Sequence, residues 1–182
     1  MNITKTDFEG LLIVDPKVFA DSRGYFVETY HEDRYQQTGM SMKFVQDNQS
    51  RSRRNVIRGL HFQRAPHAQT KLVRCIEGRI WDIAVDLRQN QPTYKKVFAI
   101  ELSAENKRQL LIPKGFAHGF SVLSEYAEVL YKCDTYYHPE TAGFIVYNDA
   151  ELNIDWKVDL KNAILSEADM KLPGVASTIG YF

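Results

Sequence analysis

The sequence predicts an all-β domain, built as a sandwich or barrel, and three observations favour this class. Short runs rich in β-branched and aromatic residues recur along the chain. Turn signals such as Gln91-Pro92-Thr93 and His138-Pro139-Glu140 separate these runs. Helical patterns are short and few, and strands at this spacing are typical of sandwiches and barrels. The expected strands cover residues 11–14, 24–30, 44–48, 56–62, 71–77, 79–87, 95–102, 109–112, 116–123, 127–134 and 143–147.

Helical signals are limited to residues 32–37 and 166–170. In the second segment Ser166 is suited to cap a helix, and Asp169 falls at the third helical position. We therefore expect only a few short helices.

The connections between the runs indicate one domain. Glu77-Gly78 stands between two alternating runs and predicts a tight β-hairpin. The C-terminal stretch around Trp156 and Pro173 has no clear period and is expected to fold back over the barrel as an irregular tail. No repeat or linker interrupts the sequence, so we expect a single domain over residues 1–182.

The composition argues against several function classes. Among 182 residues, 23 basic side chains balance 23 acidic ones, which gives no reason to expect a nucleic acid or an anionic membrane as partner. No apolar run reaches the roughly 20 residues that span a bilayer, and residues 1–10 lack a signal-peptide pattern, so a cytoplasmic protein is expected. Cys75 and Cys133 lie in apolar runs and are expected to be free core thiols.

Side-chain alternation places a lysine and a tyrosine among core residues. Lys71 shares a strand face with Val73 and Cys75, and Tyr131 shares one with Val129. For either residue alone, the simpler interpretation is a snorkelling lysine or a hydrogen-bonded core tyrosine. Together with a histidine, they suggest a ligand pocket inside the barrel.

Two histidines are suited to such a pocket. Strict alternation puts Arg58 and His61 on opposite faces, but Gly59 between them permits a β-bulge that would turn both inward. His118 follows the turn Pro113-Lys114-Gly115, which leads into a strand. The remaining histidines are interpreted as structural, because they lie in polar or turn contexts: His31, His67 and His138.

Three arginines, Arg51, Arg53 and Arg54, are interpreted as part of a solvated loop. Their segment, Ser-Arg-Ser-Arg-Arg-Asn, has turn composition and lacks the interleaved aromatic residues expected of a nucleic-acid surface.

The sequence predicts no metal and no cofactor. The segments around His61 and His118 resemble the two cupin motifs, but metal-binding cupins carry His-x-His followed by Glu. Here Gln63 stands in place of the second histidine, and Lys71 brings a positive charge to the place where a cation would sit. Two histidines cannot complete the three-ligand site that metal catalysis needs.

These segments resemble the dTDP-4-dehydrorhamnose 3,5-epimerase family, whose members are metal-independent cupins. The similarity covers nearly the whole chain, from Asp21-Ser22-Arg23-Gly24-Tyr25-Phe26 to Leu165-Ser166-Glu167-Ala168-Asp169. Its strongest segments, which are highly specific in this order, are Phe44-Val45-Gln46-Asp47-Asn48, Val56-Ile57-Arg58-Gly59-Leu60-His61-Phe62-Gln63, Lys71-Leu72-Val73-Arg74-Cys75 and Ile112-Pro113-Lys114-Gly115-Phe116-Ala117-His118-Gly119-Phe120. The resemblance implies a cupin-type jelly roll.

The resemblance also implies an isomerase that inverts C3 and C5 of dTDP-4-dehydro-6-deoxy-D-glucose, giving dTDP-4-dehydro-β-L-rhamnose for L-rhamnose biosynthesis. Removing a proton beside the C4 ketone leaves an enolate, so the reaction needs a base, a donor at the carbonyl oxygen and an acid on the opposite face. By resemblance, His61 is the base, Lys71 stabilises the enolate oxygen and Tyr131 is the acid.

A carboxylate beside His61 would fix the tautomer of the imidazole. By resemblance Asp169 supplies it. Asp82 is a further candidate, on a strand whose two faces are Ile80, Asp82, Ala84 and Asp86 against Trp81, Ile83, Val85 and Leu87; only one face is expected to be interior.

The resemblance assigns substrate binding to Arg23, Phe26, Glu28, Gln46, Asp47, Asn48, Arg58 and Lys71, with His118 near the sugar or its phosphate. Guanidinium groups grip a diphosphate bidentately, and amide side chains pair with a thymine edge. Ala142 and Ala168 stand where family members carry charged side chains, so those contacts are not carried over.

By resemblance the protein is a homodimer whose N-terminal strands cross between subunits. Four alternatives stay open: a C3 or C5 mono-epimerase, a 3,4-ketoisomerase, a non-catalytic cupin that binds nucleotide sugars, and a metal cupin. Tyr131 argues against the ketoisomerase, and Gln63 argues against the metal cupin.

Overall fold

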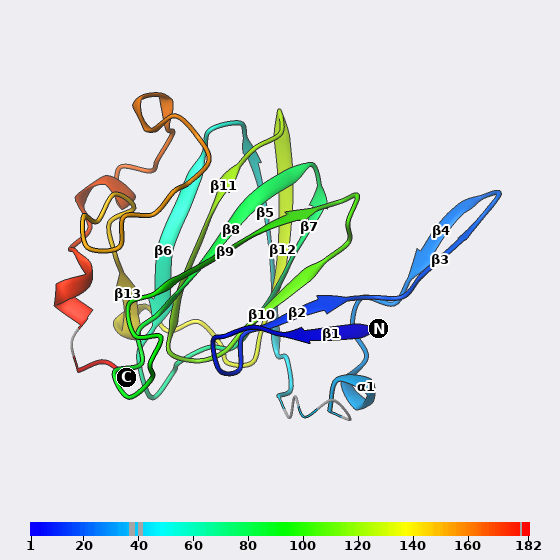
Figure 1. The fold of residues 1–182 in the computed structure, drawn as a ribbon, viewed down its shortest axis with the longest axis horizontal. Coiled ribbons are helices and arrows are strands. Elements are labelled where there is room, and N and C mark those ends of the chain that lie inside the picture. The colour runs from blue at the N-terminus through cyan, green and yellow to red at the C-terminus, as the bar shows by residue number, and fades with distance from the viewer. Residues whose placement is uncertain (37–38, 40–41, 179) are drawn as a thin grey trace.

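The computed structural model of the protein describes residues 1–36, 39, 42–178 and 180–182. Two antiparallel sheets form its body (Figure 1). The six-stranded sheet has the order β1-β2-β10-β7-β12-β5, and the five-stranded sheet has the order β13-β6-β11-β8-β9. A third, two-stranded sheet of β3 and β4 projects from the body as an arm. The all-β sandwich prediction is confirmed.

The strands of the larger sheet are β1 (Asn2–Lys5), β2 (Leu12–Asp15), β5 (Gln46–Arg53), β7 (Lys71–Glu77), β10 (Gln109–Ile112) and β12 (Tyr126–Cys133). Those of the smaller sheet are β6 (Ile57–Gln63), β8 (Arg79–Asp86), β9 (Val97–Ser103), β11 (Phe116–Val122) and β13 (Ala142–Phe144). The arm consists of β3 (Val18–Asp21) and β4 (Gly24–Val27). The sequence patterns miss β1 and β3.

Helix is scarce among the described residues. It comprises α1 (Glu32–Gln36) and the 3-10 turns η1 (Pro139–Thr141), η2 (Leu160–Asn162), η3 (Asp169–Lys171) and η4 (Val175–Thr178). Residue 37, which the first expected helix includes, lies outside the described residues. No described helix has the length and apolar character needed to cross a membrane.

The two sheets enclose an apolar core. Val73 and Cys75 of β7, Val129 of β12 and Phe120 of β11 belong to one buried cluster, against which Tyr131 packs. Burial of a valine or phenylalanine side chain of this kind contributes about 1.5–3 kcal/mol to the free energy of folding. The period-two prediction for β7 and β12 is confirmed, and it places Lys71 on the same inner face.

The C-terminal tail covers the outer face of the five-stranded sheet (Figure 1). Ile83 and Val85 of β8 are fully buried in a cluster with Trp156 and Val175 of the tail. The indole N–H of Trp156 donates to the Tyr147 carbonyl at 2.7 Å. The tail prediction is confirmed, but the expectation that only one face of β8 is interior is wrong, because the tail replaces solvent on the other face.

The turn at Glu77-Gly78 joins the two sheets, so the predicted hairpin is wrong. β7 pairs with β10 and β12, whereas β8 pairs with β9 and β11. Gly78 has a φ of 72°, and a Cβ there would collide with the Tyr126 carbonyl. Alternation within each run signals a tight turn but does not show whether the flanking strands pair.

The predicted loop at Arg51 and Arg53 is also wrong, because β5 continues to Arg53. Arg51 forms ion pairs with Glu77 at 2.8 Å and Glu128 at 3.1 Å. Acidic side chains of β7 and β12 therefore balance the charge of Arg51 on this polar strand.

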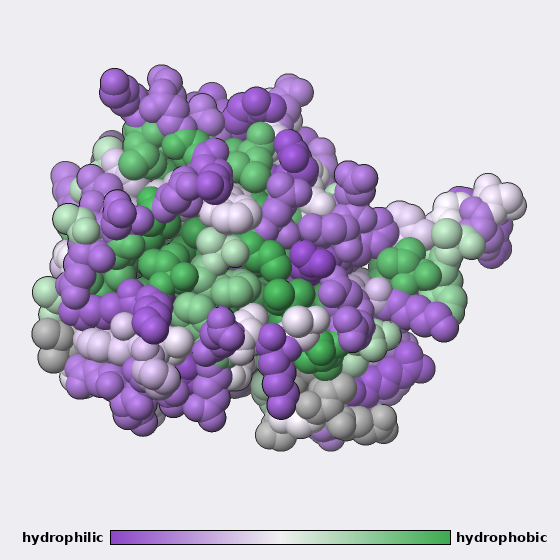
Figure 2. Space-filling view, viewed as in Figure 1, coloured by the Kyte–Doolittle hydropathy of each residue, from purple (hydrophilic) through white to green (hydrophobic). Residues whose placement is uncertain are grey.

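The β3–β4 arm exposes large apolar side chains. Phe19, Tyr25 and Phe26 are 51%, 60% and 66% exposed. Figure 2 shows apolar surface along the arm, with polar groups at its tip. Clustered apolar exposure of this kind is typical of a contact surface.

Candidate active site

Strands β6 and β11 place His61 beside His118. The two residues oppose each other in the antiparallel register, which then shifts before it reaches Arg58. β6 thus holds one extra residue, which is a β-bulge. Gly59 is required there, since its φ is 127° and a Cβ would lie 2.5 Å from the Gly119 Cα. The predicted bulge is confirmed, and Arg58 and His61 line one cavity.

Two neighbouring cavities lie between the sheets, with volumes of about 400 and 240 Å³. Both are lined by Asn48, His61, Lys71 and Tyr131. His61 belongs to the five-stranded sheet, whereas the other three belong to the six-stranded sheet. The imidazole therefore faces the lysine and the tyrosine across the interior.

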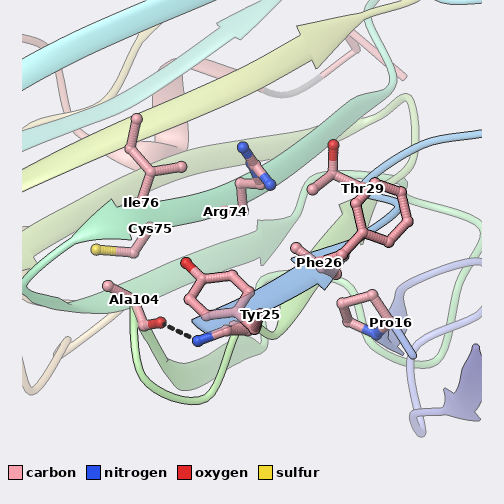
Figure 3. Close-up of a pocket in the computed structure, with 10 residues that line it drawn as sticks. Pro16, Tyr25, Phe26, Thr29, Arg74, Cys75, Ile76 and Ala104 are labelled. Atoms are coloured by element: carbon pink, nitrogen blue, oxygen red, sulfur yellow. Dashed lines mark hydrogen bonds between the residues drawn. The ribbon is translucent and has the colours of Figure 1, made fainter. Parts of the chain in front are cut away.

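A separate cavity of about 340 Å³ lies between the arm and β7 (Figure 3). Tyr25, Phe26 and Arg74 line it, whereas His61 and Tyr131 do not. It belongs to the base of the arm, apart from the cavities that hold the candidate base and acid.

Asp169 holds the imidazole of His61. The Nε2 atom of His61 lies 2.8 Å from Oδ1 of Asp169, which is 7% exposed. An ionised carboxylate can only accept, so in the neutral imidazole Nε2 carries the proton and Nδ1 presents a lone pair. The Ser166 hydroxyl accepts from the Asp169 N–H at 3.1 Å, although the helix begins only at Asp169.

Burial sets the protonation of the groups in the cavity. It lowers the pKa of His61, an effect that the hydrogen bond from His61 to the Asp169 carboxylate opposes. Burial also lowers the pKa of Lys71 and raises that of Tyr131. At neutral pH the His61 imidazole is therefore neutral and the Tyr131 phenol is protonated. The Lys71 Nζ atom lies 5.7 Å from the centre of the Tyr131 ring and has no ion-pair partner within the described parts of the chain.

Asp82 lies against His118 rather than His61. Its Oδ1 is 2.9 Å from His118 Nε2, and the carboxylate is fully buried. The Asp82 side chain points into the space between the sheets, where His118 reaches it. The candidate partnership of Asp82 with His61 is therefore wrong: β6 and β8 both pair with β11, which lies between them.

Some of the expected substrate-binding residues line these cavities. Gln46, Asn48, Arg58 and His118 do so, together with Lys71. Arg58 Nε donates to the Ser52 hydroxyl at 2.9 Å, which holds the guanidinium at the wall of the cavity.

Four other expected binding residues are not brought to the cavities. The side chain of Asp47 pairs with Lys132 at 2.9 Å, because alternation along β5 turns it away from Gln46 and Asn48. The others belong to the arm and its base: Arg23, Phe26 and Glu28. Arg23 pairs with Asp21, and Glu28 pairs with Arg34.

Comparison with known proteins identifies the family. A sequence model described as dTDP-4-dehydrorhamnose 3,5-epimerase matches residues 5–177. The chain belongs to this family. A protein of that name from Salmonella typhimurium is 52% identical over 157 residues, covering 86% of each chain. Another, from Escherichia coli strain K12, is 50% identical over 173 residues, covering 94% of this chain and 93% of its own.

Solved structures share the fold. A family member from Elizabethkingia anophelis has a TM-score of 0.93 and 49% identity, covering 100% of this chain and 99% of its own. One from Legionella pneumophila, in complex with dTDP-4-keto-L-rhamnose, has a TM-score of 0.92 and 45% identity, covering 96% and 93%. A 3'-monoepimerase from Streptomyces bikiniensis, in complex with dTDP-quinovose, has a TM-score of 0.87 and 26% identity, covering 94% and 86%.

The residues of the larger cavity to which the sequence reasoning gave no binding or catalytic role include Gln63, Gln69, Tyr137 and Phe144. Gln63 carries a signal that could have found it, because it lies two residues after His61 on the same strand face. Tyr137 follows an irregular stretch whose side chains no period orients.

Metal-ligating atoms converge elsewhere in the described part of the chain. One atom each from His67, His138 and Glu140 lies within 4.8 Å of the others, and the two imidazoles are stacked with centroids 3.6 Å apart. The stacking of His67 on His138 agrees with the interpretation of both as structural histidines.

Proposed function

We propose that this chain inverts C3 and C5 of dTDP-4-dehydro-6-deoxy-D-glucose to give dTDP-4-dehydro-β-L-rhamnose. The observation that carries the proposal is the position of His61 and Tyr131 on opposite walls of one cavity, with Lys71 beside the tyrosine. Inversion requires a base on one face of the sugar and an acid on the other, and this arrangement supplies both.

The residues account for each proton and electron pair. His61 Nδ1 removes the proton from the carbon beside the C4 ketone, and the C–H electrons form the enolate, whose oxygen the Lys71 ammonium stabilises. The Tyr131 hydroxyl then gives its proton to the opposite face of the same carbon. Exchange with solvent restores the tyrosine and the neutral histidine, and the sequence repeats at the second carbon. Asp169 stabilises the imidazolium that forms in each round.

Proton NMR in deuterated water tests the proposal. The substrate is incubated with purified protein, and the signals at C3 and C5 are followed while the product is identified. Loss of both signals with formation of the rhamno product supports the double epimerase. Loss at one carbon indicates a mono-epimerase, such as the Streptomyces relative. Saturable binding without exchange would refute catalysis.

The nucleotide-sugar site is proposed to be completed in a homodimer. Arg23, Phe26 and Glu28 are expected to bind substrate, yet in one chain they belong to the projecting arm and its base. The apolar side chains of the arm are exposed, as contact residues would be before a partner covers them. Exchange of arms between two chains would bring these residues to the partner's cavity.

Mixing inactive variants tests this exchange. Refolding Arg23→Ala with His61→Ala should restore up to about a quarter of the wild-type activity, because half of the dimers then hold one complete site. The control is His61→Ala mixed with Tyr131→Phe, which lie in one cavity and cannot complement. Recovery no greater than in the control, or a monomer by sedimentation, would contradict the arm exchange.

A cytoplasmic location is proposed on a separate ground. Cys75 and Cys133 are buried free thiols, which is common in a reducing compartment. Cell fractionation with immunodetection tests this, and recovery outside the cytoplasmic fraction would contradict it.

A further inference from the structure

Three glutamine side chains hold the main chain of residues 135–138, an irregular segment that follows β12. Gln69 Nε2 donates to the Thr135 carbonyl at 2.7 Å. Gln46 Oε1 accepts from the Tyr137 N–H at 3.0 Å. The three glutamines come from separate parts of the chain, namely β5, β6 and the loop before β7.

Gln63 makes the most extensive of these contacts. Its Nε2 donates to the His138 carbonyl, and its Oε1 accepts from the His138 N–H, both at 2.8 Å. Nε2 also reaches the Thr141 hydroxyl at 3.2 Å. The side chain thus pairs with both main-chain groups of one residue, as a neighbouring strand would.

The held segment is part of the cavity wall. Gln46, Gln63, Gln69 and Tyr137 all line the larger cavity with His61. Tyr137 is 53% exposed, so packing alone does not fix its position. Irregular main chain that has no ladder partner must otherwise find water or side chains for its polar groups.

We propose that Gln63 is a positioning residue, which acts on substrate binding by holding segment 135–138 and thereby the Tyr137 side chain in place before the nucleotide sugar arrives. This inference rests on the proposed function. Gln63 is 4% exposed, and both Nε2 and Oε1 bond to the main chain of His138, so we assign its effect to the segment rather than to direct contact with substrate. The position that carries a metal ligand in metal-binding cupins serves here to preorganise a wall of the site.

Gln46 extends this arrangement to the expected nucleotide contacts. While its Oε1 accepts from Tyr137, its Nε2 donates to Asn48 Oδ1 at 3.0 Å. A shift of the segment would therefore change the orientation of the Asn48 amide as well. Both effects act on binding and leave His61, Lys71 and Tyr131 unchanged.

Steady-state kinetics of Gln63→Ala and Gln63→Glu provide the first test. Losing two hydrogen bonds that orient the wall should raise KM about tenfold, whereas kcat should stay within about twofold of wild type. Gln63→Glu keeps the acceptor for the His138 N–H but places an oxygen against the His138 carbonyl, so KM should rise here too. Gln69→Ala removes one bond and should raise KM about threefold. A loss of kcat at unchanged KM would overturn the proposal.

A double-mutant cycle with Tyr137→Ala tests whether Gln63 acts through the segment. If it does, Gln63→Ala should raise KM by less in the Tyr137→Ala background than in the wild type, because the contribution of the Tyr137 side chain is already lost and only the effect through Gln46 and Asn48 remains. Additive effects would instead show that Gln63 acts independently of Tyr137, which would overturn the proposed route.

Asn106→Ala is the control for a general loss of stability. The Asn106 amide also holds main chain, accepting from the Ser103 and Arg108 N–H groups at 3.1 and 2.9 Å, but it lies outside the cavity. The Asn106→Ala substitution should lower the melting temperature without changing KM. A KM increase equal to that of Gln63→Ala would refute a specific role.

Calorimetric titration with dTDP separates this inference from the proposed reaction. If the wild type binds dTDP but catalyses no exchange, the proposed function fails. The dTDP affinities of the variants still test whether Gln63 positions segment 135–138 for binding. Weaker dTDP binding by Gln63→Ala than by Asn106→Ala supports the inference, and equal affinity contradicts it.

Discussion

The Asp169→Asn variant should show how much of the activity depends on the orientation and charge environment of the His61 imidazole, because the histidine itself stays in place. The carboxylate lies 2.8 Å from Nε2, and the imidazolium that forms on proton abstraction depends on its charge. At an effective dielectric constant of 20, a charge pair near 4 Å is worth about 4 kcal/mol. The His61 side chain is 40% exposed, so solvent screening reduces this to about 2 kcal/mol, or about 30-fold in rate.

The amide adds a second effect. Its NH₂ group can donate to Nε2, which moves the imidazole proton to Nδ1 and removes the lone pair that faces the cavity; a reversed tautomer can cost up to about 10⁴-fold. Asp169→Asn should therefore slow deuterium exchange at C3 and C5 by about 10²- to 10⁴-fold, with dTDP affinity nearly unchanged. Asp169→Ala removes the charge without forcing the tautomer and should be the less impaired of the two.

The pH profile gives an independent readout. Burial lowers the pKa of His61, so the acid limb of kcat/KM should lie below the ordinary value of 6.5, with activity lost as the pH falls through it. Asp169 opposes that lowering, and its removal should move the limb further toward acid. Wild-type exchange rates in Asp169→Asn, or a limb that moves toward higher pH, would refute the assigned role.

Three further changes should give distinct results. Tyr131→Phe should abolish inversion while retaining part of the exchange, because His61 can still remove a proton and return it to the same face; equal loss of both, by NMR, would assign Tyr131 to binding. Lys71→Met should reduce exchange by about 10²- to 10³-fold at unchanged dTDP affinity, and a smaller loss would place the enolate oxygen elsewhere. Trp156→Ala should cost about 3–5 kcal/mol in the free energy of unfolding by urea denaturation, since the indole is 1% exposed, and a cost below about 1 kcal/mol would contradict tight docking of the tail.

Local rules placed much of the candidate site. Alternation is enough to put Lys71 and Tyr131 on inner faces, because both lie within long, regular strands. Gly59 signals the bulge since a residue without Cβ is needed where β6 meets Gly119. The same alternation also separates Asp47 from Gln46 and Asn48, although the resemblance groups all three.

Other features depend on contacts between distant segments, which no local pattern contains. The strands on either side of Gly78 belong to different sheets, because each pairs with strands that are distant in the sequence. Burial of both faces of β8 needs the tail, and the partnership of Asp82 with His118 needs the strand order. The wall formed by residues 135–138 is set by glutamines from three separate segments.

The position of Asp169 in the C-terminal tail links completion of the candidate site to the order in which the chain is synthesised. Every strand among the described residues ends by Phe144, whereas Asp169 follows in the segment that also covers the outer face of the smaller sheet. A nascent chain whose strands have already assembled would thus present His61 and Tyr131 before the carboxylate arrives. On the proposed roles, proton transfer at full rate requires this segment to be docked, so a chain shortened before Asp169 should bind substrate but convert it slowly.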